Sequence, residues 1–331
     1  MFVPICRLTG HGADVTRGRV SPDGRTITSG SADKSMLVWD TATGEALRSF
    51  SGHPSEISDL CYHESGLGVL TSCIDGKLRL FDFRSSSSGA SLSLSAHDDA
   101  PEYSCLAVGS SVNSPLVVGG TTCGRLMSFD LRRGTLVMSA LAHYNSLSSL
   151  ATSEDDDMLI SSSLDGTIRL WSTKQGDCLM TVTDGTSNQA PCVYAGFTGN
   201  GAEFTGLFLD SVIRRWKTSD RIYCQGKVIG PKMTNSTKTF ASISSQAIAV
   251  PSEDGYVHFL DLSTGKTVQA PKKAHADDIL SVDVRGDVLV STGAGEDSSA
   301  VIWIRSSENL SHADDYNITY ALVSPQIEGL V

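Results

Sequence analysis

The chain repeats one unit several times, and this repeat restricts its fold more than any other property of the sequence. The unit opens with a Gly-His or Ala-His pair and ends in an apolar run that closes on a large residue. Gly10-His11 is followed by SGSADKSMLVWD at 29–40, and Ala142-His143 by SSSLDGTIRLWS at 161–172. Successive closing residues lie 42 to 48 positions apart. They are Trp39, Phe81, Phe129, Trp171, Trp216, Leu260 and Trp303.

A period of about 44 residues is typical of radial arrays built from four-stranded units. Within each repeat, short β-branched and apolar runs alternate with Gly, Asp, Asn and Ser, which indicates strands joined by tight turns. One such unit cannot cover both of its faces, whereas units packed side by side in a ring bury them. No helical period is sustained anywhere. The sequence therefore predicts an all-β, seven-bladed propeller over residues 1–305.

The start of the chain predicts how the ring closes. The string ICRLTGH at 5–11 has the register of LRSFSGH at 47–53, so it is an outer strand that precedes the first full repeat. No comparable strand follows Trp303. We expect residues 3–8 to complete the seventh blade, and residues 306–331 to form a C-terminal extension with no predicted role.

These motifs resemble the WD-repeat family over about residues 1–305. The resemblance implies a buried His–Ser/Thr–Asp–Trp hydrogen-bonded tetrad in each well-matched blade. The first tetrad comprises His11, Ser29, Asp33 and Trp39, and another comprises His143, Ser161, Asp165 and Trp171. His53, Thr71 and Asp75 match the same pattern, but Phe81 has no indole N–H to donate.

The recurrence of Ser, His and Asp does not predict catalysis. A catalytic triad is one constellation at one place, whereas these residues recur once per blade at positions expected to be buried. The sequence has no GxxxxGK[ST] loop, no HExxH and no His/Cys cluster at zinc spacing. We therefore expect no enzyme activity, no cofactor and no metal. The enzyme alternative requires clustered acids and histidines along the channel and ranks last.

The formal charge of −11 disfavours binding to phosphate backbones, so no direct nucleic-acid binding is expected. The same charge either attracts basic peptides or only maintains solubility. Eight cysteines without a CxxC pair indicate reduced thiols in an intracellular protein. No leader and no apolar run near 18 residues is present, which argues against secretion and membrane spanning.

Residues at the start of the innermost strands are expected to surround one mouth of the central channel. They include two hydroxyls and two aromatic rings from four blades: Ser58, Tyr103, Ser148 and Phe240. Two rings and two hydroxyls suit an arginine, whose planar cation stacks on aromatic faces while its N–H groups reach oxygen acceptors. The alternative is that small and aromatic residues merely fill the channel.

This quartet resembles the WD-repeat subunit of MLL/SET-type histone H3 lysine methyltransferase complexes. ISDL at 57–60 and FASIS at 240–244 match that family around its arginine pocket. The resemblance implies a nuclear, monomeric, non-catalytic scaffold within a larger complex. The resemblance also implies that this scaffold binds an arginine of the catalytic subunit, of the histone H3 tail, or of both.

Some positions depart from this family. Tyr103 occupies a position where that family has a phenylalanine, and Val193 one where it has a serine. Lys238 places a cation near the expected arginine site. In the family's second peptide groove, Asn200 matches but Glu203 does not.

A second resemblance gives an alternative function. FDFR at 81–84 and FDLR at 129–132 close adjacent repeats and are similar to the endings found in substrate receptors of cullin-type ubiquitin ligases. That resemblance implies that Arg84 and Arg132 dock the ligase adaptor. Otherwise the two arginines are solvated turn residues and the chain is a generic scaffold.

Overall fold

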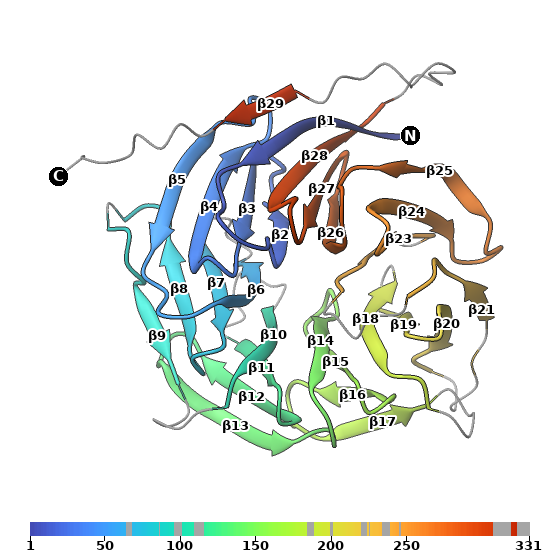
Figure 1. Ribbon diagram of the computed structural model, residues 1–331. Helices are drawn as coiled ribbons and strands as arrows, with labels where there is room; N and C mark the ends of the chain where they lie inside the picture. The colour runs from blue at the N-terminus through green and yellow to red at the C-terminus, as the bar shows by residue number, and fades with distance from the viewer. Residues whose placement is uncertain are drawn as a thin grey trace.

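A computed structural model shows seven sheets arranged radially around a central axis (Figure 1). It describes residues 1–63, 68–85, 87–95, 101–108, 116–183, 189–198, 201–219, 224, 226–233, 239–244, 246–306 and 319–322. All regular elements in these ranges are strands.

Each of the first six blades is a four-stranded antiparallel sheet whose strands follow in chain order from the axis outward. Blade one comprises β2 (Arg17–Val20), β3 (Thr26–Gly30), β4 (Ser35–Asp40) and β5 (Ala46–Ser51). Blade two comprises β6 (Ile57–Tyr62), β7 (Gly68–Cys73), β8 (Leu78–Asp82) and β9 (Leu92–Leu94). Blade three comprises β10 (Tyr103–Val108), β11 (Leu116–Thr121), β12 (Arg125–Asp130) and β13 (Thr135–Leu141).

The next three blades repeat this arrangement. Blade four comprises β14 (Leu147–Thr152), β15 (Met158–Ser163), β16 (Ile168–Ser172) and β17 (Cys178–Val182). Blade five comprises β18 (Cys192–Thr198), β19 (Glu203–Phe208), β20 (Val212–Lys217) and β21 (Gly226–Ile229). Blade six comprises β22 (Ser242–Ile243), β23 (Ala247–Pro251), β24 (Tyr256–Asp261) and β25 (Thr267–Lys273).

The seventh blade joins the two ends of the chain. Its sheet has the order β26 (Ile279–Arg285), β27 (Val288–Gly293), β28 (Ser299–Arg305), β1 (Phe2–Thr9) and β29 (Thr319–Leu322). β1 pairs antiparallel with β28, from Phe2 opposite Arg305 to Thr9 opposite Ser299. β29 pairs parallel with the outer edge of β1. The predicted seven-bladed propeller, closed by the N-terminal strand, is confirmed.

Backbone and side-chain groups of β1 add polar contacts to this closure. The buried amide of Gln269 in blade six holds the backbone of Phe2 from both sides: its Oε1 accepts the Phe2 N–H at 2.6 Å, and its Nε2 donates to the Phe2 carbonyl at 2.6 Å. Arg7 donates through Nη1 to Asp297 Oδ2 at 2.6 Å and to Ser299 Oγ at 2.8 Å. The first strand is therefore bonded to both blade six and blade seven.

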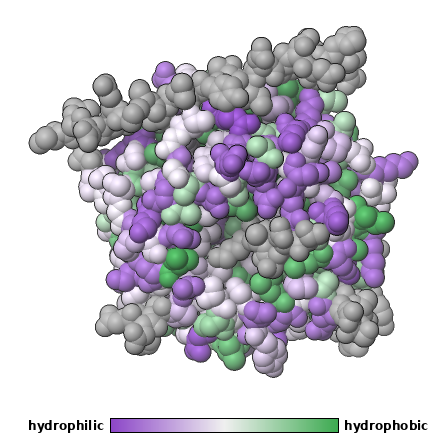
Figure 2. Space-filling model, in the orientation of Figure 1, coloured by the Kyte–Doolittle hydropathy of each residue, from purple (hydrophilic) through white to green (hydrophobic). Residues whose placement is uncertain are grey.

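The hydrophobic core lies between neighbouring blades rather than at one centre. Met36 and Phe50 of blade one, for example, pack with Ile57, Leu60 and Phe81 of blade two. Because each face of a blade is covered by the next blade, the ring must close for the first and last faces to be buried. The face drawn in Figure 2 is largely hydrophilic, with hydrophobic side chains in small separate groups. No helix in the described ranges is long and apolar enough to cross a membrane.

We predict that Gln269→Ala lowers the free energy of unfolding by about 2 to 3 kcal/mol, because two buried backbone groups of Phe2 lose their partners. Urea unfolding followed by tryptophan fluorescence measures this loss. Gln175→Ala, at an exposed turn of blade four, is the matched control and should unfold like the wild type. Equal midpoints for the two variants would show that the Gln269 clamp does not stabilise closure.

Candidate functional site

Seven inner strands line the central channel: β2, β6, β10, β14, β18, β22 and β26, each the first strand of its sheet. They are not separate walls, because short polar side chains at their midpoints bond to the next blade. Asp59 Oδ2 accepts the N–H of Leu106 at 2.9 Å, and Ser149 Oγ accepts that of Ala195 at 2.8 Å. Ser281 Oγ likewise accepts the N–H of Gly18 at 3.0 Å, across the closure from blade seven to blade one.

These interblade bonds were not predicted from the sequence. The available signal was a short polar residue within an otherwise apolar inner strand. These bonds join the inner strands of blades two and three, four and five, and seven and one, so groups that project from these neighbouring blades keep fixed relative positions.

Behind the inner strands lie the tetrads that the WD-repeat resemblance implied. In blade one, Ser29 Oγ lies 2.7 Å from His11 Nε2 and accepts the Trp39 indole N–H at 2.8 Å. His11 Nδ1 lies 3.1 Å from Asp33 Oδ2. Burial acts to raise the pKa of Asp33, but hydrogen bonds from His11 and Ser35 outweigh it and hold this pKa well below its usual range.

Blade four repeats the arrangement. Ser161 Oγ lies 2.8 Å from His143 Nε2 and accepts the Trp171 indole N–H at 2.9 Å, and His143 Nδ1 lies 3.1 Å from Asp165 Oδ2. Blade seven has a tetrad that the sequence analysis did not assign, although its Ala-His pair and closing tryptophan were visible. It comprises His275, Ser291, Asp297 and Trp303.

Blade two carries an incomplete version. The Phe81 ring packs 5.0 Å from the imidazole of His53, centroid to centroid, and Asp75 pairs with Arg79 rather than with His53. Burial, aided by the nearby positive charge of Arg79, lowers the pKa of His53 to about 4. His53 is therefore neutral at physiological pH, and its Nε2 lies 2.8 Å from Thr71 Oγ1.

The four residues predicted to surround a channel mouth do not all reach it. Ser58 and Ser148 occupy the second position of their inner strands, and each is 5% exposed. Ser58 Oγ lies 2.9 Å from Ser72 Oγ, and Ser148 Oγ donates to the carbonyl of Cys192 at 2.7 Å. Both hydroxyls are thus bonded within the protein.

Tyr103 lies between blades two and three instead of at the mouth. It is the first residue of β10 and has the register of Ile57 and Leu147, which also point into the core. Its hydroxyl donates to Met127 Sδ at 3.3 Å, and its ring lies against Gly119, where any Cβ would clash. The Tyr103 ring, expected as the second aromatic face of the channel mouth, therefore does not face the channel, because Tyr103 lies one position away from the channel-facing register of its strand.

Phe240 does stack on an arginine, but the arginine belongs to the same chain. The guanidinium carbon of Arg17 lies 3.9 Å from the Phe240 ring centroid, and Arg17 Nε lies 3.0 Å from Asp59 Oδ1. Arg17 is 1% exposed and Phe240 is 2% exposed. Burial lowers the pKa of Arg17, and the carboxylate of Asp59 opposes that effect.

Arg17 was missed in the sequence, where a single arginine between a turn and an apolar strand has no distinctive pattern. Its partners come from blades two and six, so only the ring brings them together. Asn200, expected in the second peptide groove, and Lys238, expected near the arginine site, lie outside the described residues.

Arg84 and Arg132 meet at a different place. Both line a cavity of about 210 Å³ between blades two and three, together with His63, Leu80 and Leu131. Arg84 is paired with Asp82 at 2.6 Å, and its side chain is 69% exposed.

Among the described residues, no group of three or more His, Cys, Asp or Glu side chains is placed to hold a metal ion.

Comparison with known families agrees with this architecture. The family model described as "WD domain, G-beta repeat" matches residues 2–40, 44–82 and 134–172. Three stretches of the chain therefore match this repeat, and they lie within a closed ring of seven sheets.

Curated relatives are distant. The chain is 28% identical to the nuclear distribution protein PAC1 of Arthroderma otae over 57% of its own length and 46% of the relative's. It is 25% identical to a periodic tryptophan protein 2 homolog of Dictyostelium discoideum, over 65% of this chain and 23% of that protein. For a guanine nucleotide-binding protein subunit beta of Arabidopsis thaliana the identity is 29%, over 49% and 45%. The chain thus spans half or less of these relatives.

We predict that Asp59→Asn lowers the free energy of unfolding by about 3 kcal/mol, because it leaves the buried charge of Arg17 without its counter-ion. The double variant Arg17→Met, Asp59→Asn should recover most of this loss, since no unpaired charge remains and the amide oxygen at position 59 still accepts the Leu106 N–H. Thermal and urea unfolding measure both. Asp287→Asn, at an exposed ion pair with Arg305, is the control and should behave like the wild type. If Asp59→Asn matches that control, the buried pair is not what stabilises the channel.

Proposed function

We propose that this protein is a non-catalytic, peptide-binding scaffold that holds an arginine-containing segment at the Phe240 end of its channel. We further propose that the partner is the catalytic subunit or the histone H3 tail of a histone H3 lysine methyltransferase complex. One observation carries the proposal: Phe240 already stacks on a guanidinium at 3.9 Å, so this ring has the orientation that an arginine needs, and its face becomes accessible once Arg17 leaves it.

Arg17 determines how such a partner binds. Its side chain covers the ring face that a guest arginine requires, and it is tied to Asp59. A partner's arginine therefore binds only when Arg17 has left this position, and the apparent affinity falls by the fraction of molecules in that open state. Once Arg17 is displaced, the carboxylate of Asp59 is available to the incoming cation.

We predict that Arg17→Ser strengthens binding of both a histone H3 N-terminal peptide and a catalytic-subunit motif peptide by about tenfold or more, because the internal competitor is gone. Adding Phe240→Ala to Arg17→Ser should weaken binding by at least about 2 kcal/mol, the scale of an interface hot spot. Isothermal titration calorimetry measures each, and circular dichroism verifies that the variants are folded.

Peptides in which the arginine is replaced by alanine are the controls and should not bind. If neither the wild type nor Arg17→Ser binds either peptide, the arginine-site proposal fails. If the peptides bind equally well without Phe240, another surface holds them, and only the broader scaffold role stands.

The cavity shared by Arg84 and Arg132 favours a second candidate, a substrate receptor of a cullin-type ubiquitin ligase. The two arginines come from adjacent blades and present donors on one accessible surface, as docking of an adaptor requires. The paired Asp82 orients Arg84 without hiding it.

We predict that, if this candidate is correct, the ligase adaptor is recovered with the wild-type protein and lost with the double variant Arg84→Ala, Arg132→Ala. Co-precipitation of purified adaptor measures this. Arg133→Ala, at a neighbouring exposed arginine, is the control and should retain the adaptor. Failure of the wild type to retain the adaptor would exclude this candidate without affecting the arginine-site test.

A further inference from the structure

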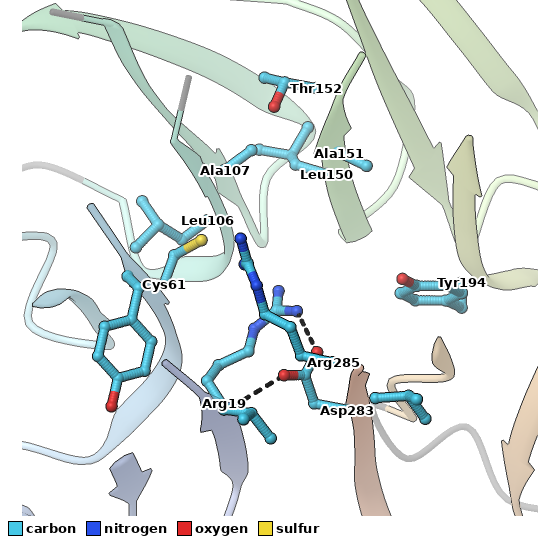
Figure 3. Close-up of a pocket in the computed structure, with 13 residues that line it drawn as sticks. Arg19, Cys61, Leu106, Ala107, Leu150, Ala151, Thr152, Tyr194, Asp283 and Arg285 are labelled. Carbon is cyan, nitrogen blue, oxygen red and sulfur yellow. Dashed lines mark hydrogen bonds and ion pairs between the residues drawn. The ribbon is translucent and has the colours of Figure 1, made fainter. Parts of the chain in front are cut away.

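The opposite mouth of the channel holds a second, differently lined site. Ser58 and Ser148 lie near the starts of their strands, whereas this cavity is lined by residues toward the other ends of the same inner strands. Its volume is about 290 Å³, and Figure 3 shows side chains from β2, β6, β10, β14, β18 and β26 around it.

The cavity is lined by more positively charged side chains than negatively charged ones. Arg19 Nη1 donates to Asp283 Oδ1 at 2.9 Å, and Asp283 Oδ2 accepts the N–H of Val20 at 2.9 Å. Both oxygens of the single lining carboxylate are therefore engaged. Arg285 follows Asp283 by two positions on β26, so the two side chains leave the same face of the strand.

Arg285 supplies the unbalanced charge. Among the residues that the structure describes, its side chain has no hydrogen-bond or ion-pair partner, and the residue is exposed. With Arg19 and Arg285 against Asp283, the charges of the lining residues total +1, in a protein whose formal charge is −11. Figure 3 shows the Arg19 and Arg285 side chains extending into the same cavity.

The remaining walls suit a small anionic group. Figure 3 shows Tyr194 on the side of β18, and burial raises the pKa of its hydroxyl, which therefore stays protonated and able to donate. Burial also raises the pKa of the Cys61 thiol, so it adds no negative charge at neutral pH. Leu106, Ala107 and Leu150 make the opposite wall apolar.

We propose that this cavity is an oxyanion site that binds one phosphate or carboxylate group carried by a side chain of a partner peptide. Arg285 contacts the anion directly, since a guanidinium with free donors matches two oxygens at once. Arg19 is neutralised by its pairing with Asp283, so Arg285 supplies the net positive charge of the site. The volume is about that of ten liquid waters, which accommodates a single acidic side chain.

This site is distinct from the arginine site of the proposed function, although Arg17 and Arg19 lie two positions apart on β2. The two sites open toward opposite ends of the inner strands and take ligands of opposite charge. A partner peptide on each face is compatible with the rigid ring between them.

The test uses the full chain and three probes: inorganic phosphate, N-acetyl-phosphoserine amide and N-acetyl-glutamate amide. Binding is measured by calorimetry at constant ionic strength, with chloride as the replacing anion. We predict saturable binding of at least one probe, weakened about tenfold or more by Arg285→Gln, because a charge-assisted contact is lost. Arg133→Gln, a similarly exposed arginine on blade three, is the control and should bind like the wild type.

Tighter binding of the phosphoserine probe assigns the site to a phosphorylated partner, and tighter binding of the glutamate probe assigns it to an acidic one. The absence of saturable binding to all three probes overturns the proposal, as does equal binding by the wild type and Arg285→Gln. Titration of Arg285→Gln with the arginine-containing peptides should match the wild type, which separates the two sites.

Discussion

Pairing of β1 with β28 is the interaction on which the rest of the structure depends. Each blade is stable only because its neighbours cover its faces, and without β1 the last blade lacks its outer strand. The strand also brings Arg7 to Asp297 and the Phe2 backbone to Gln269, so polar groups from blades six and seven are satisfied by one closure. Residues nearly 300 positions apart become neighbours, and the channel acquires a continuous wall.

The closed wall determines which charged groups project into the channel and are available for binding. Arg17 with Asp59, and Arg19 with Asp283, project from the ring toward the axis, and each pair joins two blades. Buried ion pairs contribute little net stability but fix register, since an unpaired partner is costly. Here they also divide the axis into two ends. One holds a guanidinium on Phe240, and the other leaves Arg285 facing an open cavity.

Sequence reasoning worked where a residue acts within its own repeat. His11, Ser29, Asp33 and Trp39 lie within one blade, so their spacing was sufficient to group them. It was less successful at the channel. The sequence predicts Tyr103 at the channel mouth, but the register of β10 directs its ring toward Met127. A shift of one position in a strand turns a side chain to the other face.

By itself, the sequence determined the all-β class, the number of blades and the strand that closes the ring, because these depend on a period and on local turn chemistry that recur along the chain. Only the tertiary structure decided which groups meet on the axis. Arg17 on Phe240 and Arg285 beside Arg19 join blades that are distant in sequence, and no spacing rule relates them. Such contacts arise when seven inner strands are brought around a single axis, and that step is set by packing between blades.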